Sequence, residues 1–174
     1  MSKRFGLLAG AATGLLVSAF ALGAVEPTII TAVKLSGIPR FNRMELGVKK
    51  YAADTGTTAT QVGPAQGDAQ LQVQLIADMV AKKPNALAVV PLSPEAVEPI
   101  LKKAQDAGIT VVTHEASDIQ NASYDIEAFQ NASYGVHLMD HLAGCMHGEG
   151  QYAVFVASLT SKTNNGWVDA AIAR

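Results

Sequence analysis

The sequence has few of the residues on which several large classes of proteins depend. Its 174 residues include one cysteine, Cys145, which excludes an intramolecular disulfide and a cysteine-based zinc site. Charged residues make up only 16%, and 15 Asp and Glu against 13 Lys and Arg leave no basic excess for general nucleic-acid binding. Hydrophobic residues make up 49%, which excludes a disordered chain. We therefore expect a folded protein without a nucleic-acid partner.

Motifs of nucleotide, hydrolase and metal sites are also missing. Lys34-Leu35-Ser36-Gly37 follows the first predicted strand, where a dinucleotide site would have its glycine fingerprint. No Gly-x-Ser-x-Gly nucleophile elbow occurs. His137 and His141 lie four residues apart with His147 close by, a spacing that can hold a metal, but the zincin glutamate is absent. We predict no metal and no cofactor.

Residues 1–24 have the pattern of a secretory signal peptide. Lys3 and Arg4 give a positive start, residues 5–22 are apolar or small, and small residues follow. A retained membrane anchor is the alternative, because the run is long enough to span a bilayer. The many Ala and Gly residues and the lack of a stop-transfer cluster favour cleavage. We expect an exported protein whose lone thiol, Cys145, is buried in an apolar helix.

From residue 28 onward, strand and helix patterns alternate. Asp68 and Ser93 are expected to be N-caps. Three βα units followed by a strand predict an α/β fold with a doubly wound, mostly parallel sheet and helices on both faces. The predicted strands are 28–33, 57–62, 86–90, 109–113, 124–129 and 152–157. The predicted helices are 41–54, one through Leu71 to Val80, one from Ser93 to Gly108, 134–146, and one beginning near Trp167.

The organisation changes near residue 120. We predict an N-terminal α/β lobe over residues 25–120 and the start of a second, similar lobe over 121–174. In the second part, Leu138, Met139, Leu142 and Met146 are expected to face inward. Because the sequence stops within an expected helix, we interpret the second lobe as incomplete.

Polar residues follow the predicted strands at the edge where parallel sheets bind ligands. Lys34 follows the first strand, and His114-Glu115 ends the fourth. A charged residue at the end of a buried strand needs a partner, so we predict a Lys34–Glu115 pair. Glu115 can accept hydrogen bonds from a polyol, form a structural salt bridge or act as a catalytic base.

Further candidates lie in the neighbouring loops. Arg40 and Asp68 fall in the segments after the first two strands, and Phe41 can either stack on a sugar ring or pack in the core. Asn164 and Asn165 can recognise hydroxyls, although such residues are also common in loops and caps.

Three stretches are similar to a known family: Ala32–Phe41, Leu87–Ala96 and Gly108–Glu115. Together with the signal peptide, they resemble type I periplasmic sugar-binding proteins of ABC transporters, the ribose-binding-like family, and most of all its autoinducer-2 and rhamnose-binding branch. The similarity covers nearly all of residues 28–174.

The resemblance implies a periplasmic, monomeric clamp that closes on a sugar by a hinge and is then read by a membrane permease, with no bond made or broken. Lys34 matches a ligand-contacting lysine of the autoinducer-2 receptors, and Glu115 stands where they have Asp. Thr163 and Asn164 replace an Asp-Gln pair shortly before Trp167. The expected ligand-binding set is Lys34, Arg40, Phe41, Asp68, His114, Glu115, Thr163 and Asn164.

Two other functions fit the residues. An exported enzyme acting on a sugar derivative would use Glu115 and a histidine as acid and base. A fragment of a binding protein with no activity of its own is the other alternative. A sugar-responsive transcription regulator is disfavoured, because it would need an N-terminal DNA-binding helix pair at the place that the predicted signal peptide occupies.

Overall fold

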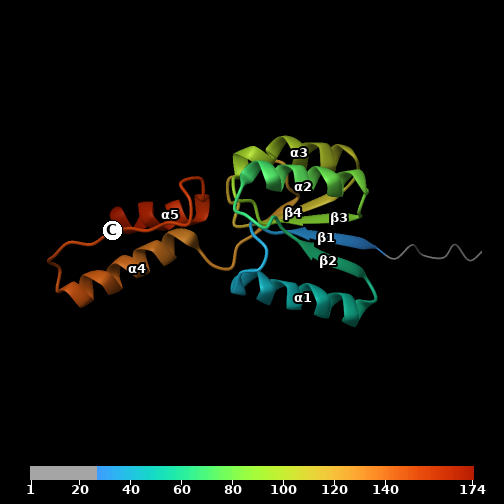
Figure 1. Ribbon diagram of the computed structural model, residues 1–174. Helices are drawn as coiled ribbons and strands as arrows, with labels where there is room; N and C mark the ends of the chain where they lie inside the picture. Colours follow the sequence, from blue (N-terminus) through green and yellow to red (C-terminus); the bar gives the residue numbers. More distant parts are fainter. Residues whose placement is uncertain (1–26) are drawn as a thin grey trace, which may run out of the picture.

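The computed structural model describes residues 27–174, so the predicted signal peptide, residues 1–24, lies outside the described part. A sheet covered by helices forms one body, and a helix pair lies beside it (Figure 1). The elements are β1 (Thr28–Ala32), α1 (Pro39–Thr55), β2 (Thr58–Val62), α2 (Ala69–Ala81), β3 (Ala86–Val89), α3 (Pro94–Asp106), β4 (Thr110–His114), β5 (Tyr124–Ile126), α4 (Asn131–Met146) and α5 (Lys162–Ile172).

The sheet has five strands in the order β2-β1-β3-β4-β5, and every neighbouring pair is parallel. Helix α1 covers one face, while α2 and α3 cover the other (Figure 1). The predicted doubly wound α/β fold is therefore confirmed. The strand order changes direction between β1 and β3, and open α/β sheets bind ligands outside the carboxyl ends of the strands at such a point.

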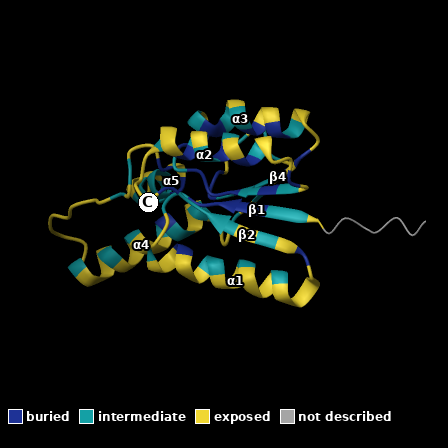
Figure 2. Ribbon diagram, turned by 45° about the vertical axis from the view of Figure 1, so that its right-hand side comes forward, coloured by how far each residue is buried: buried dark blue, intermediate teal, exposed yellow. Residues whose placement is uncertain are grey.

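The main core lies between the sheet and the α2–α3 layer. Leu87 on β3 and Val111 on β4 are fully buried, in one cluster with Ile76 of α2 and Leu101 of α3. Figure 2 colours buried residues on the sheet and on both helices. Each such side chain contributes about 1.5–3 kcal/mol relative to exposure. This layer fixes the ends of β1, β3 and β4 relative to one another.

The helix ends follow the signals in the sequence, with one difference. Asp68 caps α2, because its Oδ1 accepts hydrogen bonds from the backbone N–H groups of Gln70 at 2.7 Å and Leu71 at 3.1 Å. Gly56 ends α1 in the left-handed conformation, at φ 72°. Ser93 stands at the N-cap position of α3, but its side chain does not cap the helix. Its hydroxyl donates to the Glu95 carboxylate at 3.2 Å instead.

The strand predicted over 124–129 is shorter, at Tyr124–Ile126, and it pairs with β4 in the first sheet. The Thr113 hydroxyl also donates to Asp125 at 2.8 Å, which fastens β5 to β4. The predicted boundary at residue 121 thus precedes a strand that the first lobe's sheet contains. The chain leaves that sheet after β5.

Helices α4 and α5 pack closely on each other. Gly135 allows this approach, because an added Cβ would lie 2.2 Å from the backbone oxygen of Trp167. The residues predicted to face inward, Leu138, Met139, Leu142 and Met146, are only partly covered, and Leu138 is exposed. They point toward the side of the pair where residues 152–157 run.

The strand predicted over residues 152–157 is wrong for the described structure. The segment has no strand assignment, and Phe155 is 92% exposed. A strand requires a hydrogen-bonded neighbour, and no other strand lies beside this segment in residues 27–174. The segment has the apolar residues of a buried strand, but residues 27–174 contain no strand whose backbone could pair with it.

The prediction of a buried Cys145 is also wrong, since this thiol is exposed. Cys145 precedes the partly buried Met146 by one residue, which turns it by about 100° around α4. An apolar neighbourhood in sequence therefore did not place it on the covered face. Within residues 27–174, none of the helices has the length and apolar character needed to cross a membrane.

Removal of the α2 cap gives a direct test of this fold. Asp68→Ala should lower the free energy of unfolding by about 1 kcal/mol, because two backbone donors lose their acceptor. Urea denaturation followed by circular dichroism measures the change. Asp78→Ala removes the same side chain from an exposed position in the last turn of the same helix, away from the cap, and is the matched control. An equal loss in both variants would contradict the capping role.

Candidate ligand-binding site

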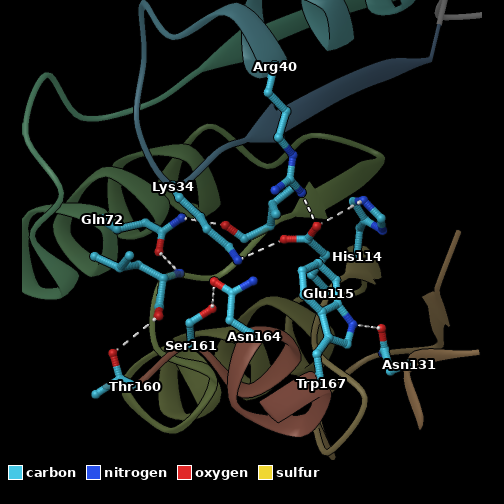
Figure 3. Close-up of polar contacts among 12 residues, drawn as sticks. Lys34, Arg40, Gln72, His114, Glu115, Asn131, Thr160, Ser161, Asn164 and Trp167 are labelled. Atoms are coloured by element: carbon cyan, nitrogen blue, oxygen red, sulfur yellow. Dashed lines mark hydrogen bonds and ion pairs between the residues drawn. The ribbon is translucent and has the colours of Figure 1, made fainter. Parts of the chain in front are cut away.

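The candidate site begins with a mostly buried ion pair across the sheet edge. Lys34 follows β1 and Glu115 follows β4, with β3 between these strands. Lys34 Nζ lies 2.8 Å from Glu115 Oε2, and the two side chains are only 14% and 10% exposed (Figure 3). The pair predicted from the sequence is confirmed. It joins two loops that are 81 residues apart in the chain.

Arg40 is the second cation on the same carboxylate. It stands in the first turn of α1, and its guanidinium hydrogen-bonds Glu115 Oε1 while its side chain is 49% exposed (Figure 3). The guanidinium also lies 5.1 Å from the centre of the Phe41 ring. Phe41 itself is 2% exposed and packs with Val33 and Val90. Of the two roles considered for Phe41, the structure shows core packing.

Glu115 combines a strained backbone with a stabilised charge. Its φ is 59°, in the left-handed region that non-glycine residues seldom occupy. Burial raises the pKa of its carboxyl, but the hydrogen bond and charge of Lys34 and the charge of Arg40 outweigh burial, so the pKa is lowered. The group is therefore a carboxylate at neutral pH, with both oxygens engaged.

His114 ends β4 on the other side of Glu115. Its Nδ1 lies 2.5 Å from the backbone oxygen of Ile126, which orients the ring toward β5. Its Nε2 lies 3.9 Å from Glu115 Oε1, beyond hydrogen-bond distance. His114 thus borders the site.

The first turn of α5 faces this cluster from the second part of the chain. Asn164 lies near the Lys34–Glu115 pair, and its Oδ1 accepts the hydroxyl of Ser161 at 3.1 Å (Figure 3). Thr163 is 4% exposed, and its buried hydroxyl has no hydrogen-bond partner among the described residues. Trp167 donates its indole N–H to Asn131 at 2.7 Å, which holds the ring at the border of the site.

Gln72 is a supporting residue that the sequence reasoning missed. This fully buried side chain of α2 donates to the Val90 oxygen at 2.9 Å and accepts from the Leu92 N–H at 2.8 Å. The Leu92 oxygen is in turn 3.4 Å from the hydroxyl of Thr160, in the segment before α5. A signal was present, because Gln72 is four residues from buried Ile76 and so lies on the apolar stripe of α2.

Lys162 makes a second link between the two parts of the chain. Its ammonium lies 3.3 Å from Glu95 on α3 and 3.5 Å from Asp118 in the loop after β4. These residues border a polar cavity of about 480 Å³ beside the start of α5. The first turn of α5 is thus held next to the edge that carries Glu115.

Two other predicted features lie apart from this cluster. Asp68 makes its side-chain contacts to the first turn of α2, and none of them reaches Lys34, Arg40 or Glu115. The rings of His137 and His141 are 4.3 Å apart on α4. Residues 27–174 contain no group of three or more His, Cys, Asp or Glu side chains placed to hold a metal ion.

The sequence profile of the periplasmic binding protein domain matches residues 29–174. The chain belongs to this family. A D-ribose/D-allose-binding protein of Pseudomonas aeruginosa is 30% identical over 114 residues, which cover 64% of this chain and 34% of that protein. The D-allose-binding periplasmic protein of Escherichia coli is 29% identical over 134 residues, 74% of this chain and 42% of that protein.

A solved structure of this architecture is an ABC transporter solute-binding protein of Clostridium phytofermentans with bound L-rhamnose. The two structures match with a TM-score of 0.80 at 23% sequence identity. The matched part covers 86% of this chain and 47% of the Clostridium protein. At this identity the likeness concerns the fold alone. The chain thus spans less than half the length of each of these three proteins.

The pH dependence of stability tests the charge network of Glu115. Glu115→Gln should lower the free energy of unfolding by about 1–3 kcal/mol at neutral pH, because two cations lose their anionic partner. The folded-state pKa of Glu115 is lowered, so its stabilisation is present above the ordinary glutamate pKa of about 4.3 and is lost as the pH falls through the folded-state value. Urea titrations across acidic and neutral pH measure the difference between wild type and variant.

The control for this experiment is Glu45→Gln, which removes the same charge from an exposed i,i+4 pair with Lys49 on α1. That pair is expected to contribute less than about 1 kcal/mol. A wild-type advantage over Glu115→Gln that did not shrink at acidic pH would contradict the assigned role of the carboxylate.

Proposed function

We propose that this protein is the substrate-binding component of an ABC importer and that it captures a sugar between two lobes. The observation that carries the proposal is the Lys34–Glu115–Arg40 cluster at the strand ends, with the first turn of α5 opposite (Figure 3). The family supports the class, since two relatives are named as binding proteins for ribose or allose. The relatives are binding proteins, which agrees with a role without catalysis.

The cluster has the chemistry that sugar recognition requires. Sugar hydroxyls both donate and accept, and hydrogen bonds to charged groups are the stronger ones. Lys34 and Arg40 supply donors, the Glu115 carboxylate supplies acceptors, and the amide of Asn164 supplies both. Among the predicted ligand residues, we propose direct contact for Lys34, Arg40, His114, Glu115, Thr163 and Asn164. Phe41 and Asp68 instead support the loops that carry them.

The arrangement of the chain fits a clamp. The first lobe ends with β5, the chain crosses after Ile126, and the α4–α5 pair presents the other wall. Closure about this crossing would bring Asn164 and Thr163 onto a sugar held by Glu115, as in hinge motions around ligands. We propose that the mature protein works as a monomer in the periplasm after removal of residues 1–24, and that a membrane permease reads the closed form.

A sugar titration followed by Trp167 fluorescence tests this function. Trp167 is the sole tryptophan and borders the site, so a ligand near Glu115 changes its signal. The panel is D-ribose, D-allose, L-rhamnose, D-arabinose and autoinducer-2. Because the chain spans less than half of its relatives' length, we expect binding with a Kd of about 1 mM, equivalent to about −4 kcal/mol. Glu115→Gln should weaken this binding at least about tenfold, which is about 1.4 kcal/mol.

The controls separate binding from general effects of the variant. Glu45→Gln should leave the titration unchanged, and amide shifts in a two-dimensional NMR spectrum should concentrate at residues 34–41, 113–116 and 161–167. No change with any sugar at about 50 mM, far above the expected Kd, would contradict the proposal. Equal sugar affinities of wild type and Glu115→Gln would contradict a role of the Lys34–Glu115–Arg40 cluster in binding.

A further inference from the structure

The charges of Lys34, Arg40 and Glu115, at the centre of the site, do not sum to zero. Glu115 carries one negative charge, whereas Lys34 and Arg40 carry two positive charges and both contact its carboxylate. Lys34 and Glu115 are mostly buried and neutralise each other. Arg40 is the surplus cation and also the member that is half exposed, so it is the one a ligand can reach.

The donors of these groups are also in excess. An ammonium has three N–H donors and a guanidinium has five, while the contacts to Glu115 use one from each. Each oxygen of Glu115 accepts one of these hydrogen bonds, so about two of its four acceptor sites remain, against about six unused N–H donors. The larger unoccupied capacity is therefore for an acceptor, and a planar guanidinium matches a carboxylate with two parallel hydrogen bonds.

Two helix N-termini add positive potential at the same place. Arg40 lies in the first turn of α1, and Asn164 lies in the first turn of α5. Neither first turn contains an acidic residue, although such residues commonly offset the partial positive charge of a helix start. The buried hydroxyl of Thr163, in that turn of α5, has no partner among residues 27–174 and can donate.

Two further carboxyls, Glu95 and Asp118, lie beside the start of α5 and contact the Lys162 ammonium at 3.3 and 3.5 Å. Two others lie toward the far edge of the sheet. Asp125 is on β5, with β4 and β3 between it and β1, and it accepts the Thr113 hydroxyl. Glu127 directly follows β5, and burial and the charge of the neighbouring Asp125 raise the pKa of its carboxyl. The anionic side of the site is thus next to β5, and the cationic side is next to β1 and α1.

We propose, building on the function proposed above, that the sugar carries a carboxylate and that Arg40 is the specificity-determining residue that binds it. The ligand class is a sugar acid, such as a uronate, whose single negative charge matches the single surplus positive charge. Its hydroxyls reach toward Asn164, while its carboxylate lies against the guanidinium at the start of α1.

The test uses pairs of sugars that differ only in this group: D-glucuronate with D-glucose, and D-galacturonate with D-galactose. NMR shifts and Trp167 fluorescence of the 174-residue chain measure the affinities. At least one acid should bind about tenfold more tightly than its neutral partner, and this preference should fall as salt rises from about 20 to 500 mM. D-glucose 6-phosphate, with two negative charges, should bind less tightly than D-glucuronate.

Two variants of α1 assign the effect to Arg40. Arg40→Met should lower affinity for the acid at least about tenfold more than it lowers affinity for the matched neutral sugar, because the neutral sugar loses only hydrogen bonds and no charge pair. Arg43→Met removes the same charge from the same helix, three residues further along, and should change neither affinity. Arg40→Lys keeps the charge without the planar fork and should retain part of the preference.

The outcomes separate this proposal from the general one. Binding of neutral sugars as tight as that of the acids, lost in Glu115→Gln, would overturn the acidic ligand and leave the sugar-binding function standing. Preference for the phosphate, or an acid preference that survives in Arg40→Met, would also overturn it. Absence of binding by any sugar, neutral or acidic, would overturn both proposals.

Discussion

The ion pair between Lys34 and Glu115 is the contact on which the rest of the site depends. A carboxylate removed from water at the end of β4 is costly unless a cation and hydrogen bonds compensate it. Lys34 supplies both at 2.8 Å, and it can do so because β1 and β4 end on the same edge of a parallel sheet. The pair therefore fixes the distance between two loops, and Arg40 is then drawn to the free oxygen of Glu115.

The backbone of Glu115 shows that this position is constrained by more than packing. A left-handed conformation costs a non-glycine residue about 1–2 kcal/mol, and a glycine would relieve that cost. The chain has a side chain there that forms two ion pairs, at φ 59°. Strain of this kind tends to accompany functional positions, because the surroundings must hold the residue in place. Here the cations hold it, and the α2–α3 core holds the strand.

Sequence patterns predicted correctly those features of the structure that depend on a single helix or strand and on the residues next to it. Alternating βα patterns gave the parallel sheet, a capping residue gave the start of α2, and the position of charges at strand ends gave the Lys34–Glu115 pair. Wrong predictions came where the environment was non-local. Residues 152–157 have a strand pattern without a neighbouring strand, and Cys145 lies a fraction of a turn from the covered face. Gln72 was missed because a buried amide depends on two loop groups, at Val90 and Leu92, that only the fold brings to it.

Among residues 27–174, the hydrogen bonds and ion pairs that join the α4–α5 part of the chain to the rest are few, and this bears on how a clamp could work. Lys162 reaches Glu95 and Asp118 at 3.3 and 3.5 Å with an exposed ammonium, and the Thr160 hydroxyl reaches the Leu92 oxygen at 3.4 Å. Exposed ion pairs stabilise weakly because water screens them, and polar interfaces between domains favour relative motion. Such an interface can open without exposing a hydrophobic core. A ligand that bridged Glu115 and Asn164 would then shift the balance toward closure by the binding energy that it gains only when both walls contact it.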